Sequence, residues 1–155
     1  MTMRMLMAIA ITTTIACSTF APETGPLAPA CSDVDSDPAN AVVFARDIRP
    51  LMSRQRFDPD PGCKTCHYST ETSHAGTDLS GLDLASLGAL RRGGANTGAR
   101  IVVAGKPCSS ALVQKLDGTY PGARMPKDAT RFWTAAEIQL VMDWIAEGAN
   151  GRDDE

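Results

Sequence analysis

Two cysteines and a histidine lie close together in the middle of the chain, in the segment Cys63-Lys-Thr-Cys66-His67. On one helical turn, residues three apart share a face, so both thiols can reach the same flat ligand while the imidazole that follows lies beneath its centre. This C-x-x-C-H spacing is the attachment motif of c-type haem, in which the cysteines form thioethers and the histidine binds the iron. We therefore predict one covalent haem c, attached to Cys63 and Cys66, with His67 as an axial iron ligand.

Other chemistries that use a pair of cysteines fit the sequence less well. A thioredoxin-like redox pair requires a βαβ setting, which the pattern of this chain does not provide. A zinc site requires a second pair of cysteines or histidines at finger spacing, whereas Cys31, His74 and Cys108 are isolated. A structural disulfide within the motif would span only two intervening residues, which is uncommon.

The second axial ligand has to come from another part of the chain. Met125 lies in the loop Gly122-Ala-Arg-Met-Pro126, and a thioether opposite the imidazole gives a low-spin iron with a raised potential, which suits electron transfer. His74 is the rival ligand, and an open sixth position is the third possibility; Met125 is the ligand we predict. A backbone carbonyl, such as that of Pro107, is expected to orient the His67 ring.

The chain begins with a segment typical of secretory signals. One positive charge is followed by an apolar run from Met5 to Ile11 and by small residues up to Ala16. The run is shorter than the 20 or so apolar residues, about 30 Å of helix, that a membrane span needs. Thr14-Ile-Ala-Cys17 is similar to the lipobox of bacterial lipoproteins. We therefore expect residues 1–16 to be a lipoprotein-type signal peptide and Cys17 to be the lipidation site, with ordinary cleavage after Ala16 as the alternative.

Export bears on the two remaining cysteines, because disulfides persist outside the cytoplasm. Cys31 and Cys108 are an even pair once the other three cysteines are assigned. A disulfide between them would tie the N-terminal segment to the second half of the domain, although spacing alone leaves the pairing open. Residues 17–41 are rich in proline and acidic side chains, with too little apolar surface to fold alone, and are expected to form a linker.

The rest of the chain has the pattern of short helices joined by long loops. Apolar residues at helical spacing predict helices over 42–57, 87–92, 109–116 and 134–147. The last of these begins with Thr134-Ala-Ala-Glu137, which has the form of a capping box. Three intervening segments are expected as a polar loop, an extended piece and a lone strand, over 68–80, 81–84 and 100–104. Residues 150–155 are expected to form a solvated tail.

The composition agrees with a small domain built around a prosthetic group. Two tryptophans, two tyrosines and four phenylalanines among 155 residues are few for a self-sufficient core, and 13 glycines and 10 prolines indicate many loops. A formal net charge of −3 offers no surface for a polyanion, so nucleic acid is not expected as a partner.

Six short segments occur in the order seen in planctomycete-type cytochrome c domains, and the chain resembles that family over about residues 42–149. The segments are Phe44-Ala-Arg-Asp-Ile-Arg-Pro50, Cys63-Lys-Thr-Cys-His67, Gly81-Leu-Asp-Leu84, Gly105-Lys-Pro-Cys-Ser-Ser-Ala-Leu112, Arg124-Met-Pro126 and Trp144-Ile-Ala-Glu-Gly-Ala149. The resemblance implies an all-α fold, a small class I cytochrome c-like domain with long loops around a covalently bound haem. It also implies that the N- and C-terminal helices cross near the haem edge and that His67 and Met125 are the axial ligands.

The expected function is that of an electron carrier rather than an enzyme. It would exchange single electrons with redox partner proteins on the periplasmic side of a bacterial membrane, anchored by its lipid and without a small-molecule substrate. Two alternatives stay open. One is a haem peroxidase or small-ligand-binding haem protein with a labile sixth position, and the other is a haem-bearing interaction module of a membrane assembly.

Overall fold

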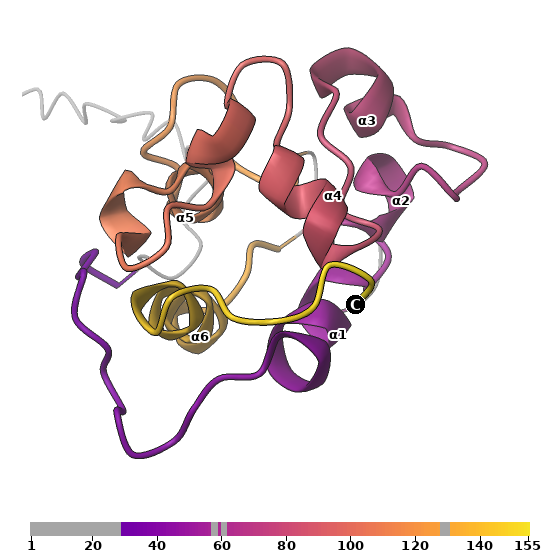
Figure 1. Ribbon diagram of the computed structural model, residues 1–155. Coiled ribbons are helices and arrows are strands. Elements are labelled where there is room, and N and C mark those ends of the chain that lie inside the picture. The colour runs from indigo at the N-terminus through magenta and orange to yellow at the C-terminus, as the bar shows by residue number, and fades with distance from the viewer. Residues whose placement is uncertain (1–28, 57–58, 60–61, 128–130) are drawn as a thin grey trace, which may run out of the picture.

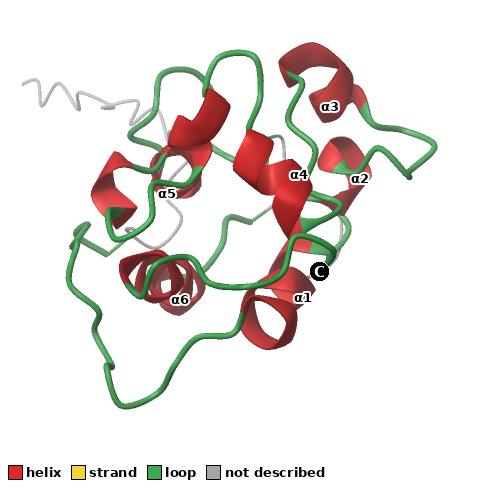
Figure 2. Cartoon of the chain, in the orientation of Figure 1, coloured by secondary structure: helices red, strands yellow, loops and turns green. Residues whose placement is uncertain are grey.

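The computed structural model describes residues 29–56, 59, 62–127 and 131–155. Within these ranges the chain forms short helices joined by long loops and contains no strand, as Figure 2 shows. The predicted all-α class is therefore confirmed for this part of the chain. The predicted signal segment, Cys17 and the first part of the linker lie outside the described residues.

Most of the helices are short, and α6 (Ala135–Ala146) is the longest of those described. They are η1 (Phe44–Ile48, a π-helical turn), α1 (Arg49–Met52), α2 (Lys64–His67), α3 (Ala75–Ser80), α4 (Leu87–Arg92), η2 (Gly98–Ile101, 3₁₀), η3 (Pro107–Ser109, 3₁₀), α5 (Ala111–Asp117) and α6 (Ala135–Ala146).

Three predicted segments differ from the structure. The helix expected over 42–57 is shorter: it consists of η1 and α1 and ends at Met52, after which the described residues to 56 are not helical. The expected strand over 100–104 is wrong: the chain there ends η2 and continues as a loop. No neighbouring strand exists in the described residues to receive it, and the Val103 amide donates instead to Ser110 Oγ at 2.8 Å. The second half of the expected polar loop over 68–80 forms α3, which begins after His74.

The longest helix, α6, has the N-terminus that the sequence predicts. The Thr134 amide donates to Glu137 Oε2 at 2.7 Å, and the Glu137 amide donates to Thr134 Oγ1 at 3.2 Å. Burial acts to raise the pKa of Glu137, but hydrogen bonds from Thr134 and Arg54 outweigh it and hold this pKa below its usual range. The helix therefore begins with two of its free amides satisfied and with a carboxylate at its positive end.

The core is built where α6 packs against η1 on one side and against α5 on the other (Figure 1). The side chains that α6 buries are Ile138, Val141, Met142, Asp143, Trp144 and Ile145. The Trp144 ring contacts Phe44 of η1 with ring centroids 5.3 Å apart. The first and last helical segments of the domain are thus in direct contact.

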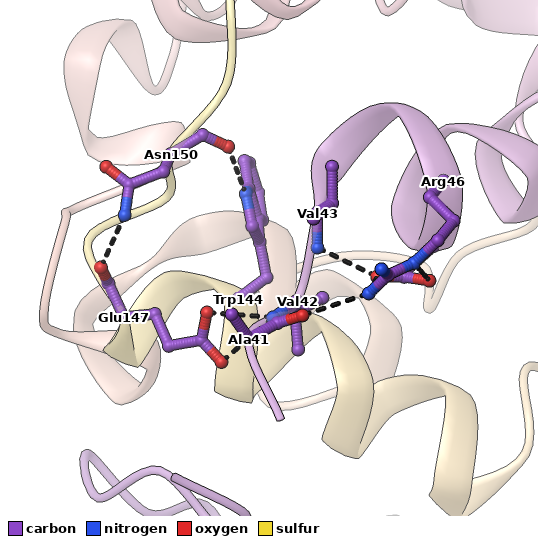
Figure 3. A network of polar contacts seen from close by, with 8 residues as sticks. Ala41, Val42, Val43, Arg46, Trp144, Glu147 and Asn150 are labelled. Atoms are coloured by element: carbon purple, nitrogen blue, oxygen red, sulfur yellow. Dashed lines mark hydrogen bonds and ion pairs between the residues drawn. The ribbon is translucent and has the colours of Figure 1, made fainter. Parts of the chain in front are cut away.

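The acidic segment before η1 is bonded to the domain rather than detached from it. Cys31 and Cys108 form a disulfide with Cα atoms 5.6 Å apart. The Ser36 amide and hydroxyl donate to the buried Asp143 carboxylate at 2.9 and 2.7 Å. A few residues further on, the Val42 amide donates to the Glu147 carboxylate at 2.9 Å, as Figure 3 shows.

The C-terminal residues 150–155 also return to the domain, although most of their side chains are exposed. The Trp144 indole donates to the Asn150 carbonyl at 2.9 Å (Figure 3). The Leu87 amide, at the start of α4, donates to the Glu155 carbonyl at 2.8 Å. The tail is therefore exposed in its side chains, as expected, but its backbone closes over α4.

Candidate functional site

The turn that carries the cysteine motif is fixed at its start by the preceding helix. Cys63 is the residue before α2, and its amide donates to the Met52 carbonyl at 3.0 Å. Gly62 lies so close to this region that an added Cβ would stand 2.5 Å from the Arg54 carbonyl oxygen. The chain can make this approach only with glycine at position 62.

Both motif cysteines are free thiols in the structure, with no disulfide between them. Burial raises the pKa of the Cys63 thiol to about 12. A redox-active cysteine needs the opposite shift, because the thiolate is the reactive form. Among the described residues no three His, Cys, Asp or Glu side chains gather to hold a metal ion by themselves. The raised pKa of Cys63 is therefore not that of an activated redox thiol.

The His67 imidazole is held in one orientation by a backbone carbonyl. Its Nδ1 lies 3.1 Å from the Leu82 oxygen, and because a carbonyl only accepts, Nδ1 carries the proton and Nε2 keeps a lone pair. Burial lowers the pKa of His67, against the opposing effects of the Leu82 hydrogen bond and the Asp83 charge. A neutral imidazole with a fixed tautomer is the form that binds a metal. The orienting group is a backbone carbonyl, as expected, but it is that of Leu82 and not that of Pro107.

Helix α3 packs against the turn of α2 (Figure 1), and Gly76 of α3 lines the first cavity together with His67. An added Cβ at Gly76 would lie 2.8 Å from His67 Nε2 and Cε1 and 2.8 Å from the Cys66 carbonyl oxygen. Glycine at this position therefore lets the backbone of α3 lie close against the Nε2 edge of the ring, where any side chain would clash. The sequence signal was a glycine within a polar segment, which by itself does not indicate such a role.

Two adjoining cavities open beside the motif, with volumes of about 300 Å³ and about 240 Å³. They share four lining residues, Cys63, His67, Ser80 and Met125. The rest of the second cavity is mostly aliphatic, with walls from Leu82, Leu84, Ile101, Leu112 and Leu116. Pockets of about 300–1,000 Å³ with apolar walls and a few placed polar groups are typical of ligand and cofactor sites.

Met125 reaches these cavities from a distant part of the sequence. Its loop follows α5, and the Met125 amide donates to the Lys115 carbonyl at 2.9 Å. The structure thus gathers the predicted haem cysteines, His67 and Met125 around one hollow. His74 lines neither cavity: its Nδ1 lies 2.7 Å from the Glu71 oxygen, and its Nε2 lies 3.4 Å from Asp78 Oδ1.

Two buried hydrogen-bond donors near the start of the motif have no acceptor in the part of the chain that the structure describes. Arg54 Nη1 pairs with Glu137 Oε1 at 2.8 Å, but Arg54 Nη2 is buried and unpartnered among the described residues. The same is true of Trp133 Nε1, whose residue is 1% exposed and whose ring lies 5.5 Å from the Arg54 guanidinium carbon. An unsatisfied buried donor costs about 1–3 kcal/mol. Neither Arg54 nor Trp133 lines either cavity, so these two donors belong to the packing beside α6 rather than to the walls of the hollow.

The basic side chains near Met125 differ in what they contact. Lys127 lines the first cavity together with Arg56. Arg124 instead donates from Nε to the Leu116 carbonyl at 2.7 Å and stacks on the Phe132 ring at 4.2 Å, so it braces the loop. The cavity therefore has cationic side chains at its wall, which is compatible with an anionic ligand.

Comparison of the chain with models of known families, with curated proteins and with solved structures found no match. Within residues 29–155, apart from the short gaps, no helix is long and apolar enough to cross a membrane.

Proposed function

We propose that the chain is an exported, lipid-anchored monohaem c-type cytochrome that carries single electrons between redox partner proteins. The observation that carries this proposal is the shared hollow, lined by Cys63 and His67 from the motif and by Met125 from a loop far along the chain. A covalent haem with two axial ligands needs two cysteines, a histidine and a second ligand such as methionine around one cavity.

The residues fit a haem group in three respects. Cys63 and Cys66 are unpaired and line the first cavity, so both are available for thioether formation. The Leu82 carbonyl leaves His67 Nε2 with its lone pair available to an iron. The walls of the second cavity are largely apolar.

When bound, haem supplies a one-electron iron couple, and the protein determines its potential and its access. A histidine and a methionine in both axial positions would leave no coordination place for a substrate and would raise the potential. The apolar walls would exclude water from the ring, which also raises the potential by disfavouring the more charged form. These properties suit an electron carrier that makes and breaks no substrate bonds.

The anchor proposal rests on Cys17, which lies outside the described residues, and on the lipobox-like segment before it. From Cys31 onward the chain is bonded to the domain through the disulfide. A lipid at Cys17 would therefore be joined to the folded part by a short tether. Fully extended, 14 residue steps reach about 50 Å, so the haem domain would stay within that distance of its membrane and of membrane-bound partners.

The test is to produce the full chain in a host with c-type haem maturation and to record three properties. We expect the haem to resist acid–acetone extraction, its pyridine adduct to have the spectrum of two thioethers, and the ferric protein to have the weak far-red methionine–iron charge-transfer band. Met125→Leu should abolish that band, whereas Met52→Leu, the same change at a buried core methionine, should keep it.

Each other outcome has a definite meaning. A wild-type chain without covalent haem would overturn the cytochrome proposal. Covalent haem without the far-red band would overturn the carrier proposal and favour a labile sixth position with ligand chemistry. Retention of the band in Met125→Leu would remove Met125 from the ligand set.

A further inference from the structure

The loop that brings Met125 to the cavity is closed on the last turn of α5 at both of its ends. The loop begins at Gly118, which is the left-handed residue that ends α5 (φ +89°). The Tyr120 amide donates to the Gln114 carbonyl at 3.0 Å, and the Met125 amide donates to the Lys115 carbonyl at 2.9 Å. The position of Met125 thus depends on residues of α5 rather than on the loop alone.

The Lys115 side chain lies inside the curve of this loop. Its ammonium donates to the Pro121 carbonyl at 2.9 Å and to the Ala123 carbonyl at 3.3 Å. It also lies 4.8 Å from the centre of the Tyr120 ring, within the range of a cation–π contact. One cation therefore binds three points along the loop, and the backbone of the same residue holds Met125.

Lys115 also lines the second cavity, beside Met125 and Tyr120. Charge-assisted hydrogen bonds are stronger than neutral ones. An ammonium has three donors, so it can bridge loop carbonyls such as those of Pro121 and Ala123, which make no helical hydrogen bond. Without the ammonium, these carbonyls could turn towards solvent and the loop could open.

We propose that Lys115 is a positioning residue that keeps the Met125 thioether at the cavity by holding the loop 118–125 closed. The proposal rests on the function proposed above, because it concerns the sixth ligand of the same haem. It predicts that Lys115 controls how firmly Met125 binds the iron without affecting covalent attachment, which depends on the opposite side of the cavity.

The test compares three variants of the full chain. Lys115→Met keeps the length and apolar stem of the side chain and removes its donors and charge. Lys115→Arg keeps charge and donors. Lys106→Met is the matched control, because this lysine is 61% exposed and its nearest charged partner is Asp33 at 3.8 Å, so the variant loses the same charge away from the loop.

The main measurement is the affinity of ferric protein for imidazole, which enters the sixth position only when Met125 is detached. Apparent affinity scales with the fraction of open protein, and loss of a charge-assisted hydrogen bond changes such a fraction by about tenfold or more. We expect Lys115→Met to bind imidazole about tenfold more tightly than Lys106→Met, with a weaker far-red band and a lower midpoint potential. Lys115→Arg should lie between Lys115→Met and the wild type.

A readout that does not depend on haem completes the test. Amide hydrogen exchange of the segment 118–126 should be faster in Lys115→Met than in Lys106→Met, while exchange in α6 should be unchanged. Imidazole affinity and segment exchange within twofold of the control would overturn the role of Lys115 while leaving the cytochrome proposal intact. Equal behaviour of Lys115→Arg and Lys115→Met would overturn the role of the ammonium contacts. Absence of covalent haem or of the far-red band in wild type would overturn both proposals.

Discussion

Gly76 is a position where two effects of opposite sign can be compared. It lies inside α3, and in a helix alanine is normally more favourable than glycine by about 0.8–1.0 kcal/mol. However, the Cβ of Gly76→Ala would lie 2.8 Å from His67 Nε2 and Cε1 and from the Cys66 carbonyl oxygen. Forced overpacking of this kind costs about 1–3 kcal/mol.

The steric clash should outweigh the gain in helix propensity, because the atoms that the added Cβ would contact cannot easily move. The Cys66 carbonyl belongs to the backbone of α2, and the His67 ring is held by its hydrogen bond to Leu82. We therefore expect Gly76→Ala to destabilise the protein by about 1 kcal/mol net of the helix gain. In the proposed cytochrome, a displaced imidazole should also weaken the axial bond of His67, which would appear as a lower far-red absorbance per haem.

The measurement is denaturant unfolding of the full chain, with Gly88→Ala as the matched control. Gly88 is the other glycine within a described α-helix, and its added Cβ would lie 2.9 Å from Asp153 Cβ. The Gly88 amide donates to the Asp153 carbonyl at 3.0 Å, so this variant should also lose stability, but far from His67 and with the far-red band of the wild type. If Gly76→Ala were as stable as the wild type and kept its far-red band, the packing of α3 on the imidazole edge would be refuted.

Three further predictions concern the frame around the cavity. Cys108→Ser removes the disulfide between residues 77 apart in the sequence. On the loop-entropy account this should lower the free energy of unfolding, measured with denaturant, by about 4 kcal/mol. Equal stability of the wild type with and without reductant would contradict this prediction. Ser110→Ala removes a fully buried hydroxyl that accepts from the Val103 amide and donates to the Lys106 carbonyl, so it should cost about 1–3 kcal/mol; a Ser109→Ala control, at an exposed position, should be near neutral. Glu137→Gln tests the lowered pKa of Glu137. The wild type should be more stable than this variant above about pH 4.3, the pKa of a glutamate in the unfolded chain. This difference in stability should decrease as the pH falls through the lower pKa of Glu137 in the folded protein. A stability difference that is independent of pH would contradict the last of these.

The features that sequence reasoning predicted correctly are those that depend on near neighbours along the chain. The capping box of α6 is specified by Thr134 and Glu137 alone. The helix Leu87–Arg92 is bounded by a serine whose hydroxyl accepts from the Ala89 amide and by a glycine with positive φ. In both cases the groups that stabilise the end of the helix lie within one turn of it, so their spacing is visible in the sequence.

The features that the sequence did not predict depend on contacts between distant segments. The carbonyl that orients His67 belongs to Leu82, and a backbone group carries no residue-type signal. The predicted strand over 100–104 failed because a strand needs a partner, and Ser110 supplied the acceptor instead. The linker was expected from its composition, yet Ser36 reaches Asp143 across more than a hundred residues. Its acidic and proline-rich composition did not reveal these specific acceptors.

The two sides of the cavity are held by separate sets of contacts, and this separation has a functional consequence. The histidine side is fixed by the end of α1, by Gly76 of α3 and by Leu82, whereas the methionine side is fixed by the last turn of α5. Locally held segments open with their own free energies. Changes on the histidine side should therefore alter haem attachment and overall stability together. Changes at Lys115 should alter the sixth ligand, and hence the potential, while attachment and global unfolding stay as they are. In the cytochrome proposed above, the loop after α5 would therefore set the potential independently of the turn that carries Cys63, Cys66 and His67.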